Sequence, residues 1–231
     1  MEQPSASNPL GNPPYPGVTT SNGPNWVNLL ATTYNQSLVL TYDFAFGGAT
    51  VDQGVVAAYN PGVISMRRQV EELYLPKYAA APATAPWTAR DSLFAFFIGI
   101  NDVGNSYGEG DHTTNGRVME RYAELVEKVY GSGARNFVFF MVPPVDRAPM
   151  IGMVAASLGD GVAAVARKEA AAIADWNRRM VDMVSGFTRR RRDATAFVFD
   201  THGLYSQILD RPGQYAQTAG LRNTTDFCVE Y

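Results

Sequence analysis

The sequence has one cysteine, no apolar run of membrane-spanning length and no excess of positive charge. A transmembrane helix needs about 20 consecutive apolar residues, so none is predicted here. The net charge of −3 and the isoelectric point of about 5.4 give no indication of a nucleic-acid partner or of binding to an anionic membrane. We therefore expect that the chain binds neither nucleic acid nor membrane.

The single cysteine, Cys228, leaves the cellular compartment open. In a secreted protein an unpaired cysteine suggests a missing partner, whereas in an intracellular protein a free thiol is equally ordinary. Residues 1–17 contain no charged segment followed by an apolar one, so we expect no signal peptide within this chain. The two sequons, at Asn35 and Asn223, support secretion only weakly because such triplets often arise by chance.

The apolar residues are numerous enough, at 46% of 231 residues, to form one sizeable core, so one domain over residues 1–231 is expected. Runs typical of buried strands alternate with stretches of helical spacing. The run 92–99 is almost wholly apolar, as a strand buried on both faces requires. This order predicts an α/β fold with a mainly parallel sheet and helices on both faces. The expected strands are 37–45, 92–99, 136–142 and 195–200, and the expected helices are 25–34, 63–74, 116–130, 160–187 and 204–209.

Turns rich in glycine and polar residues follow the expected strands, at the edge of a parallel sheet where ligands bind. A glycine turn lets a backbone N–H approach a ligand with no Cβ in the way. An asparagine amide is a donor that stays neutral at every working pH. Gly48 in FGGAT and Asn101 in GIND could together hold the negative oxygen of a tetrahedral ester intermediate. Each is an ordinary turn residue when taken alone, whereas their joint position at neighbouring strand ends makes the catalytic interpretation competitive with that one.

These blocks resemble those of the SGNH/GDSL hydrolases. FGGAT, followed about fifty residues later by GIND, is similar to two blocks of that superfamily. PSASNPLGNPPYPG, GPNW, FFIGINDVGNSY and FVFDTHGLY resemble the fungal acetylesterases among its carbohydrate esterases. The resemblance covers nearly the whole chain and implies a flavodoxin-like three-layer sandwich without a metal or an organic cofactor. It also implies a secreted, monomeric enzyme that hydrolyses acetyl or other short acyl esters of plant cell-wall carbohydrates.

Carried over by position, the resemblance makes Gly48 and Asn101 the oxyanion donors, with Asp102 shaping the turn. Two further blocks of the family have no counterpart in this chain. They are the Gly-Asp-Ser turn that carries the nucleophile and the Asp-x-x-His that carries the base. By resemblance they would stand before residue 1 and after Tyr231, and the first strand of the sheet is expected to be missing with them.

The chain as written is therefore expected to be inactive as an esterase. A second hypothesis is a non-catalytic relative that keeps the cleft as a carbohydrate-binding surface. A flavodoxin-like nucleotide or flavin binder ranks last, because no phosphate-binding loop such as GxGxxG is present.

Residues inside the chain offer weak substitutes for the missing catalytic groups. His202 follows Asp200 by two residues at a strand end, and Asp200 could orient it as a base. The family's acid and base have a different spacing, so a structural role is favoured for His202. His112 lies in a polar loop and is expected to be solvated. Ser5 and Ser7 lie in a proline-rich loop without an adjacent base, and an unactivated serine is a weak nucleophile.

Aromatic residues are expected around the site, because sugar rings stack on aromatic faces. Tyr42 and Tyr107 are candidates to line it. Trp26 and Phe46 are also candidates, but large aromatic residues are usually buried, so the core is the favoured place for these two.

Overall fold

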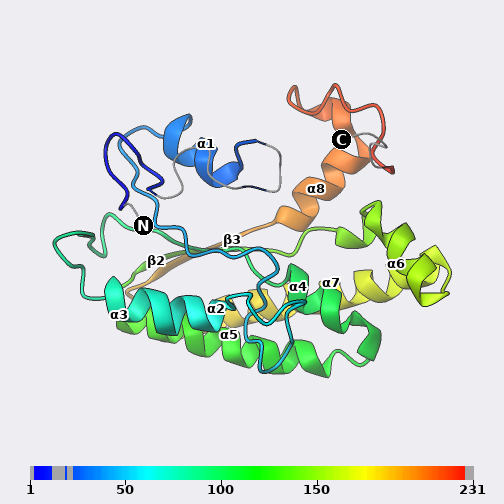
Figure 1. Cartoon of the computed structure of the whole chain (residues 1–231), viewed down its shortest axis with the longest axis horizontal. Coiled ribbons are helices and arrows are strands. Elements are labelled where there is room, and N and C mark those ends of the chain that lie inside the picture. The colour runs from blue at the N-terminus through cyan, green and yellow to red at the C-terminus, as the bar shows by residue number, and fades with distance from the viewer. Residues whose placement is uncertain (1–2, 12–18, 20–22, 227–231) are drawn as a thin grey trace.

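The structure is a computed structural model that describes residues 3–11, 19 and 23–226. A parallel sheet runs through it with helices on both sides (Figure 1), which confirms the predicted α/β class. The strands are β1 (Phe94–Phe96), β2 (Asn136–Phe140) and β3 (Thr195–Phe199). The α-helices are α1 (Trp26–Thr32), α2 (Met66–Arg68), α3 (Leu75–Lys77), α4 (Ile100–Ser106), α5 (Thr113–Gly131), α6 (Met150–Leu158), α7 (Val162–Arg190) and α8 (Thr201–Asp210). A π-helical stretch, η1 (Gln69–Tyr74), joins α2 to α3, and short 3-10 turns lie at η2 (Tyr107–Glu109), η3 (Val145–Arg147) and η4 (Pro212–Gln214).

The three strands pair in parallel in the order β1-β2-β3. Phe96 of β1 lies opposite Phe139 of β2, and Phe140 lies opposite Phe199 of β3. Parallel neighbours need a crossover connection, and α4 with α5 supplies the first while α6 with α7 supplies the second. The carboxyl ends of all three strands consequently meet at one edge of the sheet, where α4 and α8 begin.

One face of the sheet carries the hydrophobic core. α5 and α7 cover this face (Figure 1), and both pack against the side chains of β2. Phe137 and Phe139 are fully buried there, together with Tyr122 of α5 and Trp176 of α7. The ring of Phe96 stacks on Phe139 with the centroids 5.3 Å apart. Alternate residues of β2 therefore point into one well-packed layer, as the period of a strand requires.

The opposite face of the sheet is only partly covered. Trp26 of α1 packs on it, with its ring 4.9 Å from that of Phe140. Phe197 and Phe199 of β3 keep 59% and 45% of their surface exposed. Burial of the run 92–99 on both faces was expected, and that expectation is wrong, because Leu93 and Ala95 are exposed.

Residues 37–45 form no strand, so that prediction is wrong. Thr41 donates its N–H to the carbonyl of Pro9 (2.8 Å), and no ladder bond joins this stretch to β1 in the described part of the chain. Leu38 and Val39 are exposed. The alternating pattern is real, but a strand persists only beside a partner whose backbone groups it can pair with.

α1 confirms the helix expected at 25–34, but not the direction of its side chains. The side chain of Asn25 accepts the backbone N–H of Asn28 (3.2 Å) and caps the helix. Trp26 was expected in the core, yet both Trp26 and Leu30 are exposed. Their apolar face meets the partly covered side of the sheet, which offers only a few side chains to pack against.

α6 was not predicted, because its sequence, MIGMVAASL, is apolar throughout and has no polar face to mark a helical period. Ile151 and Ala155 are its buried residues, and they pack with Val165 of α7 in a small cluster apart from the main core. Over the described ranges, no single helix is long and apolar enough to cross a bilayer. The pair α6 and α7, bent by 111°, passes that test on length and composition alone.

Candidate functional site

The glycine turn is a tight turn that only glycine fits. The N–H of Ala49 donates to the carbonyl of Phe46 (3.0 Å), and Gly48, the third residue of the turn, has φ +81°. This is the pattern of a type II turn. The ring of Tyr59 lies directly on Gly48, and a Cβ added there would overlap it, with Cδ1 at 2.8 Å. Glycine is therefore required at position 48 for two reasons: its positive φ, and the lack of space for a Cβ beneath the Tyr59 ring.

α4 begins directly after β1 and carries the asparagine block. Gly99 precedes it with φ +116°, and a Cβ on Gly99 would lie 2.5 Å from the indole ring of Trp176. Trp176 of α7 therefore packs directly on the backbone of this turn. Asn101 and Asp102 follow in the first turn of α4, at the carboxyl edge of the sheet.

Side chains of α4 bind the segment that follows the glycine turn. Three polar residues of the helix, at its second, third and sixth positions, reach backbone groups of that segment. The bonds are Asn101 Nδ2 to the Ala49 carbonyl (3.0 Å), Val51 N–H to Asp102 Oδ1 (3.0 Å) and Oδ2 (3.2 Å), and Asn105 Nδ2 to the Ala57 carbonyl (3.0 Å). The two blocks, about fifty residues apart in sequence, are therefore joined directly.

Gly48 and Asn101 consequently lie near each other, and each has a donor to spare. The backbone N–H of Gly48 has no hydrogen-bond partner among the described residues. Asn101 donates through Nδ2 to Ala49, and an amide nitrogen carries two N–H groups. Both residues are half-buried, so a ligand oxygen could reach them. Their part in catalysis stays a prediction.

Asp102 is a fully buried carboxyl group beneath these donors. Burial raises its pKa to about 7, the nearby Asp52 carboxylate adds to the rise, and the Val51 N–H opposes it. The hydroxyl of Tyr122 is also fully buried, without a hydrogen-bond partner in the part of the chain that is described. Burial, and then the charge of Asp102, raise the pKa of Tyr122. The expectation that Asp102 shapes the turn agrees with its bond to Val51.

Comparison with known proteins identifies the family. Residues 7–226 match the family described as GDSL-like Lipase/Acylhydrolase. The chain belongs to the GDSL family. It is 38% identical over 214 residues to an acetylesterase from Thermothelomyces thermophilus, which covers 92% of this chain and 68% of that protein.

Two more distant relatives agree with the assignment. A thermolabile hemolysin from Vibrio parahaemolyticus is 26% identical over 210 residues, which cover 91% of this chain and 43% of the hemolysin. A GDSL esterase/lipase from Arabidopsis thaliana is 24% identical over 170 residues, covering 69% of this chain and 43% of the plant protein. The resemblance noted in the sequence is thereby confirmed, and the chain spans less than half the length of these two relatives.

The substitutes considered for a GDSL nucleophile and base are not assembled. Asp200 caps α8 by accepting the N–H of Gly203 (2.7 Å), and no hydrogen bond joins it to His202 within the described residues. Ser5 and Ser7 pair with each other (3.3 Å between their hydroxyl oxygens). No serine hydroxyl bonds to a histidine anywhere in the described ranges. This arrangement fits the structural role predicted for His202.

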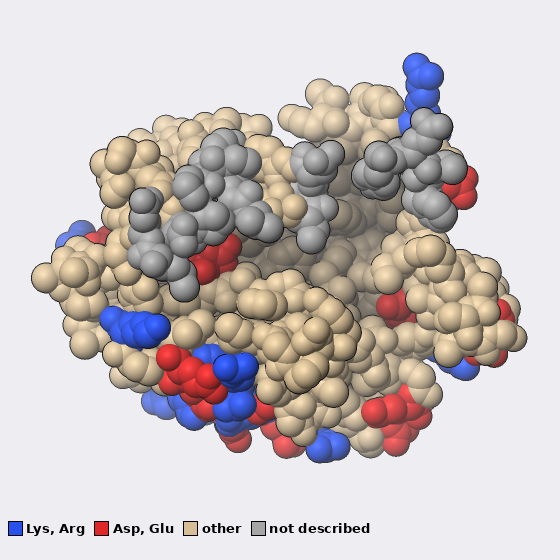
Figure 2. Space-filling model, in the orientation of Figure 1, with Lys and Arg blue, Asp and Glu red and all other residues tan. Residues whose placement is uncertain are grey.

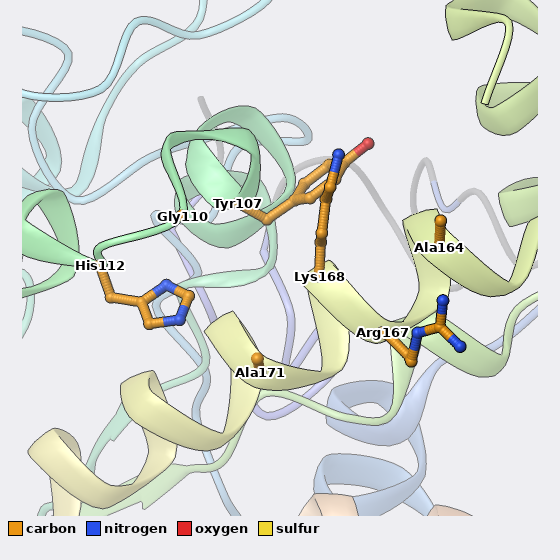
Figure 3. A pocket seen from close by; sticks show the side chains of 7 residues that line it. All are labelled: Tyr107, Gly110, His112, Ala164, Arg167, Lys168 and Ala171. Atoms are coloured by element: carbon orange, nitrogen blue, oxygen red, sulfur yellow. The ribbon is translucent and has the colours of Figure 1, made fainter. Parts of the chain in front are cut away.

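A shallow groove of about 360 Å³ lies at the far end of α4 (Figure 3). Tyr107 and His112 come from the segment between α4 and α5, while Lys168 and Arg167 come from α7. His112 was expected to be solvated, and it borders this groove. Tyr107 was expected to line the site, and it stands six residues beyond Asn101, a helical rise of about 9 Å. Small residues complete the lining, namely Gly110, Ala164 and Ala171.

Charge in this groove is mixed. Lys168 Nζ lies 3.5 Å from Asp160, and Arg167 has no ion-pair partner in the described part of the chain. Burial raises the pKa of Tyr107, and the charges of the buried Glu169 and of Asp160 add to the rise. The groove thus offers N–H donors beside an aromatic ring, and Arg167 with Lys168 makes its lining basic, since Asp160 offsets Lys168 alone.

The exposed aromatic residues differ from the expectation. Trp26 and Phe46 were expected in the core, and both are exposed. Tyr42 is half-buried and packs edge-on against Tyr78, with the ring centroids 5.4 Å apart. Of the four aromatic candidates, the two that sequence reasoning placed inside are therefore the most accessible.

Tyr59 was missed by sequence reasoning. It is 77% exposed, although one side of its ring covers Gly48. It lies in an irregular stretch, where no periodicity indicates the direction of a side chain. Only the tertiary contact with the glycine turn reveals that Tyr59 borders the candidate site.

Charged residues gather away from the carboxyl edge. Figure 2 shows Lys, Arg, Asp and Glu mostly over the helical layer, whereas the described residues around the hollow between α1 and α8 are mostly uncharged. Asp52 illustrates the contrast, since it pairs with Arg121 (2.9 Å) and Arg67 (3.3 Å). Within the described residues, no group of three or more His, Cys, Asp or Glu could hold a metal ion.

Proposed function

We propose that this GDSL-family chain supplies the oxyanion-stabilising part of an ester hydrolase, with the Gly48 N–H and the Asn101 amide as its donors. One observation carries the proposal: the hydrogen bond from Asn101 Nδ2 to the carbonyl of Ala49, the residue next to Gly48. The family supports ester hydrolysis as the reaction class. The similarity to an acetylesterase supports an acetyl or other short acyl group.

The chemistry follows from the polarity of these donors. When a nucleophile attacks an ester carbonyl, the carbonyl oxygen becomes an anion. Two fixed N–H groups stabilise that anion more than they stabilise the neutral ester, and this difference lowers the barrier. Neither donor titrates, so the stabilisation is available at every working pH.

The nucleophile and the base are proposed to come from outside residues 1–231. No serine–histidine pair exists in the described residues, and the chain spans 68% of the acetylesterase's length. An oxyanion hole acts only after attack has begun, so the 231-residue chain alone is proposed to be inactive. In this proposal, the complete protein is a secreted monomer.

Carbohydrate esters of the plant cell wall are the proposed substrates. The groove beside Tyr107 supports this, because an aromatic ring flanked by His112 and Lys168 offers both a stacking face and hydrogen-bond donors to hydroxyl groups. The same groove favours the alternative function, a non-catalytic carbohydrate-binding relative. The two hypotheses differ on whether an ester is cleaved when the missing groups are supplied.

Hydrolysis of p-nitrophenyl acetate tests the proposal. The purified chain should not exceed the residual rate of about 10³–10⁴ over water that remains when a serine triad is removed. The same chain, extended by its flanking coding sequence, should turn over the ester. In that background Asn101→Ala should lower the rate by about 10²–10³.

Asn105→Ala is the matched control, because Asn105 binds the same loop through Ala57 and faces no proposed ligand. It should leave the rate nearly unchanged. An extended protein that is inactive but binds xylo-oligosaccharides would replace the esterase by the binding function. Robust turnover by the 231-residue chain, lost on His202→Ala, would instead make His202 a base.

A further inference from the structure

The groove beside Tyr107 lies beyond the carboxyl edge of the sheet, on the side where Asn101 lies. Helix α5 runs back along the sheet to β2, and its 19 residues are about 28 Å long. The five residues of β2 cover only about 17 Å. The first turns of α5, with His112 at their start, therefore extend past the edge. A groove in this place can bind a part of the substrate other than the ester.

Two adjacent cations of α7 determine the charge of the groove. Arg167 and Lys168 stand between Ala164 and Ala171, whose small side chains leave the charged groups accessible to a ligand. Asp160 lies 3.5 Å from Lys168 Nζ, whereas Arg167 has no ion-pair partner among the described residues. Two cations against one acid leave a single positive charge without compensation.

The other acids near the groove do not cancel that charge. The Asp111 carboxylate accepts the N–H (3.0 Å) and the hydroxyl (2.9 Å) of Thr113, and Glu109 accepts the hydroxyl of Thr114. Both acids are thus engaged with the first turn of α5, and neither lines the groove. Burial raises the pKa of Glu169 to about 7, so this residue is mostly protonated at pH 6.

Neutral hydrogen-bonding groups line the remainder of the groove. Tyr107 and His112 form no side-chain hydrogen bond within the described ranges, so the hydroxyl and the imidazole are available to a ligand. His112 has φ +56°, which is uncommon for a residue other than glycine. This backbone conformation places a histidine opposite the cations of α7.

We propose that the groove binds the carboxylate of an acidic sugar unit, a uronate, which is joined to the esterified carbohydrate. Arg167 is its principal partner, Lys168 the second, and Tyr107 with His112 binds the sugar hydroxyls. The inference names the substrate class of the proposed function and rests on it. A single uncompensated charge suits a carboxylate, whereas a phosphate group carries nearly two negative charges. The planar fork of an arginine also matches a carboxylate through two parallel hydrogen bonds.

NMR titration of the 231-residue chain at pH 6 and low salt tests the proposal with two matched ligands. One is a xylo-oligosaccharide that carries one glucuronate unit, and the other is the same oligosaccharide without it. The acidic ligand should bind roughly tenfold more tightly, and 0.5 M NaCl should remove most of this difference. Resonances of residues 107–112 and 164–171 should shift on binding.

Variants assign the difference to the groove. Arg167→Ala should remove most of the tenfold preference, and Lys168→Ala should lower it by about two- to threefold, since Asp160 already offsets that charge. Arg178→Ala is the matched control, because it removes one exposed cation from the same helix, where Arg178 pairs with Asp175 and Asp182 away from the groove. It should leave the preference unchanged.

The possible failures are distinguishable. Equal binding of the two ligands, or a preference that survives the double variant of Arg167 and Lys168, would overturn the uronate site and leave the proposed ester hydrolysis intact. Tighter binding of glucose 6-phosphate than of glucuronate would overturn the assignment to a carboxylate. Binding of neither oligosaccharide would overturn both this inference and the proposed carbohydrate substrate.

Discussion

The two faces of the sheet both carry phenylalanine side chains, but these are buried on one face and exposed on the other. On the face covered by α5 and α7, Phe137 and Phe139 are fully buried. On the other face, Phe197 and Phe199 of the neighbouring strand remain about half exposed. Phenylalanine alternates along both strands, so the difference does not come from the sequence of the strands. It comes from whether a second layer of helices packs against them.

The comparison also explains the missing strand. Residues 37–45 have the residue types and alternation of a strand, yet they pair with no strand in the described chain. β1 is only three residues long. β1 has a ladder partner in β2, whereas residues 37–45 have none, although Phe44 packs against Tyr74 and Tyr78. Local preference without tertiary support therefore leaves an extended but unpaired segment.

The largest effect is expected when a phenylalanine is removed from the covered face of the sheet rather than from the open face. Phe139→Ala should lower the free energy of unfolding by about 3–5 kcal/mol, because it removes a fully buried ring and leaves a cavity. Phe197→Ala, the same change on the open face, should lower it by less than about 1 kcal/mol. Urea denaturation followed by circular dichroism measures both values. Equal losses would mean that another molecule covers the open face in solution.

The second prediction concerns the two acids beneath the covered face. Burial raises the pKa of Asp102, and burial with the Asp146 carboxylate raises that of Glu169, in each case to about 7. Folding thus favours their protonated forms, so their stabilising contribution is full below about pH 4 and is lost as pH rises through 7. The free energy of unfolding should fall between pH 5 and pH 8, by an amount on the order of 3 kcal/mol.

Matched variants separate this effect from other titrations. Asp102→Asn and Glu169→Gln should flatten the decline, each in part, when denaturation is repeated at several pH values. The pKa of Asp52 is shifted in the opposite direction. Burial raises it, but the Gly54 N–H and Arg121 lower it overall. Its contribution is lost as pH falls below about 4. A stability that rises from pH 5 to pH 8 would contradict the prediction.

A smaller effect is expected at the glycine turn. Gly48→Ala should lower the free energy of unfolding by about 1–2 kcal/mol, because alanine is strained at φ +81° and its Cβ meets the Tyr59 ring. Gly47→Ala, one residue earlier, should be nearly neutral, since nothing lies within 4 Å of its added Cβ. Thermal denaturation distinguishes the two. In a Gly48→Ala background, Tyr59→Ala should relieve the overlap but not the backbone strain.

The smallest effect is expected in α1, on the open face. Asn25→Ala removes the side chain that caps the helix and should lower local stability by about 1 kcal/mol. Hydrogen exchange should accelerate in residues 26–32 by several-fold, with the amides of α5 unchanged. A parallel change in α5 would show that α1 unfolds together with the core rather than on its own.

Much of the fold was accessible from the sequence, because the relevant signals are local. The spacing of apolar residues predicted α5, α7 and α8, and short apolar runs predicted β1, β2 and β3 with boundaries within a few residues. The glycine turn and the asparagine block could be recognised for the same reason, since each is a short motif. The uniformly apolar α6 was missed, because it has neither period nor polar face.

By itself, the sequence determined which segments can be helices or strands, and which two turns carry donors suited to an oxyanion. Only the tertiary structure decided which of these possibilities were realised. It left 37–45 unpaired, exposed Trp26 and Phe46, set Tyr59 on Gly48, and joined Asp102 to Val51. The physical reason is that pairing, burial and the ionisation of a buried acid depend on neighbours distant in the chain, which no local pattern specifies.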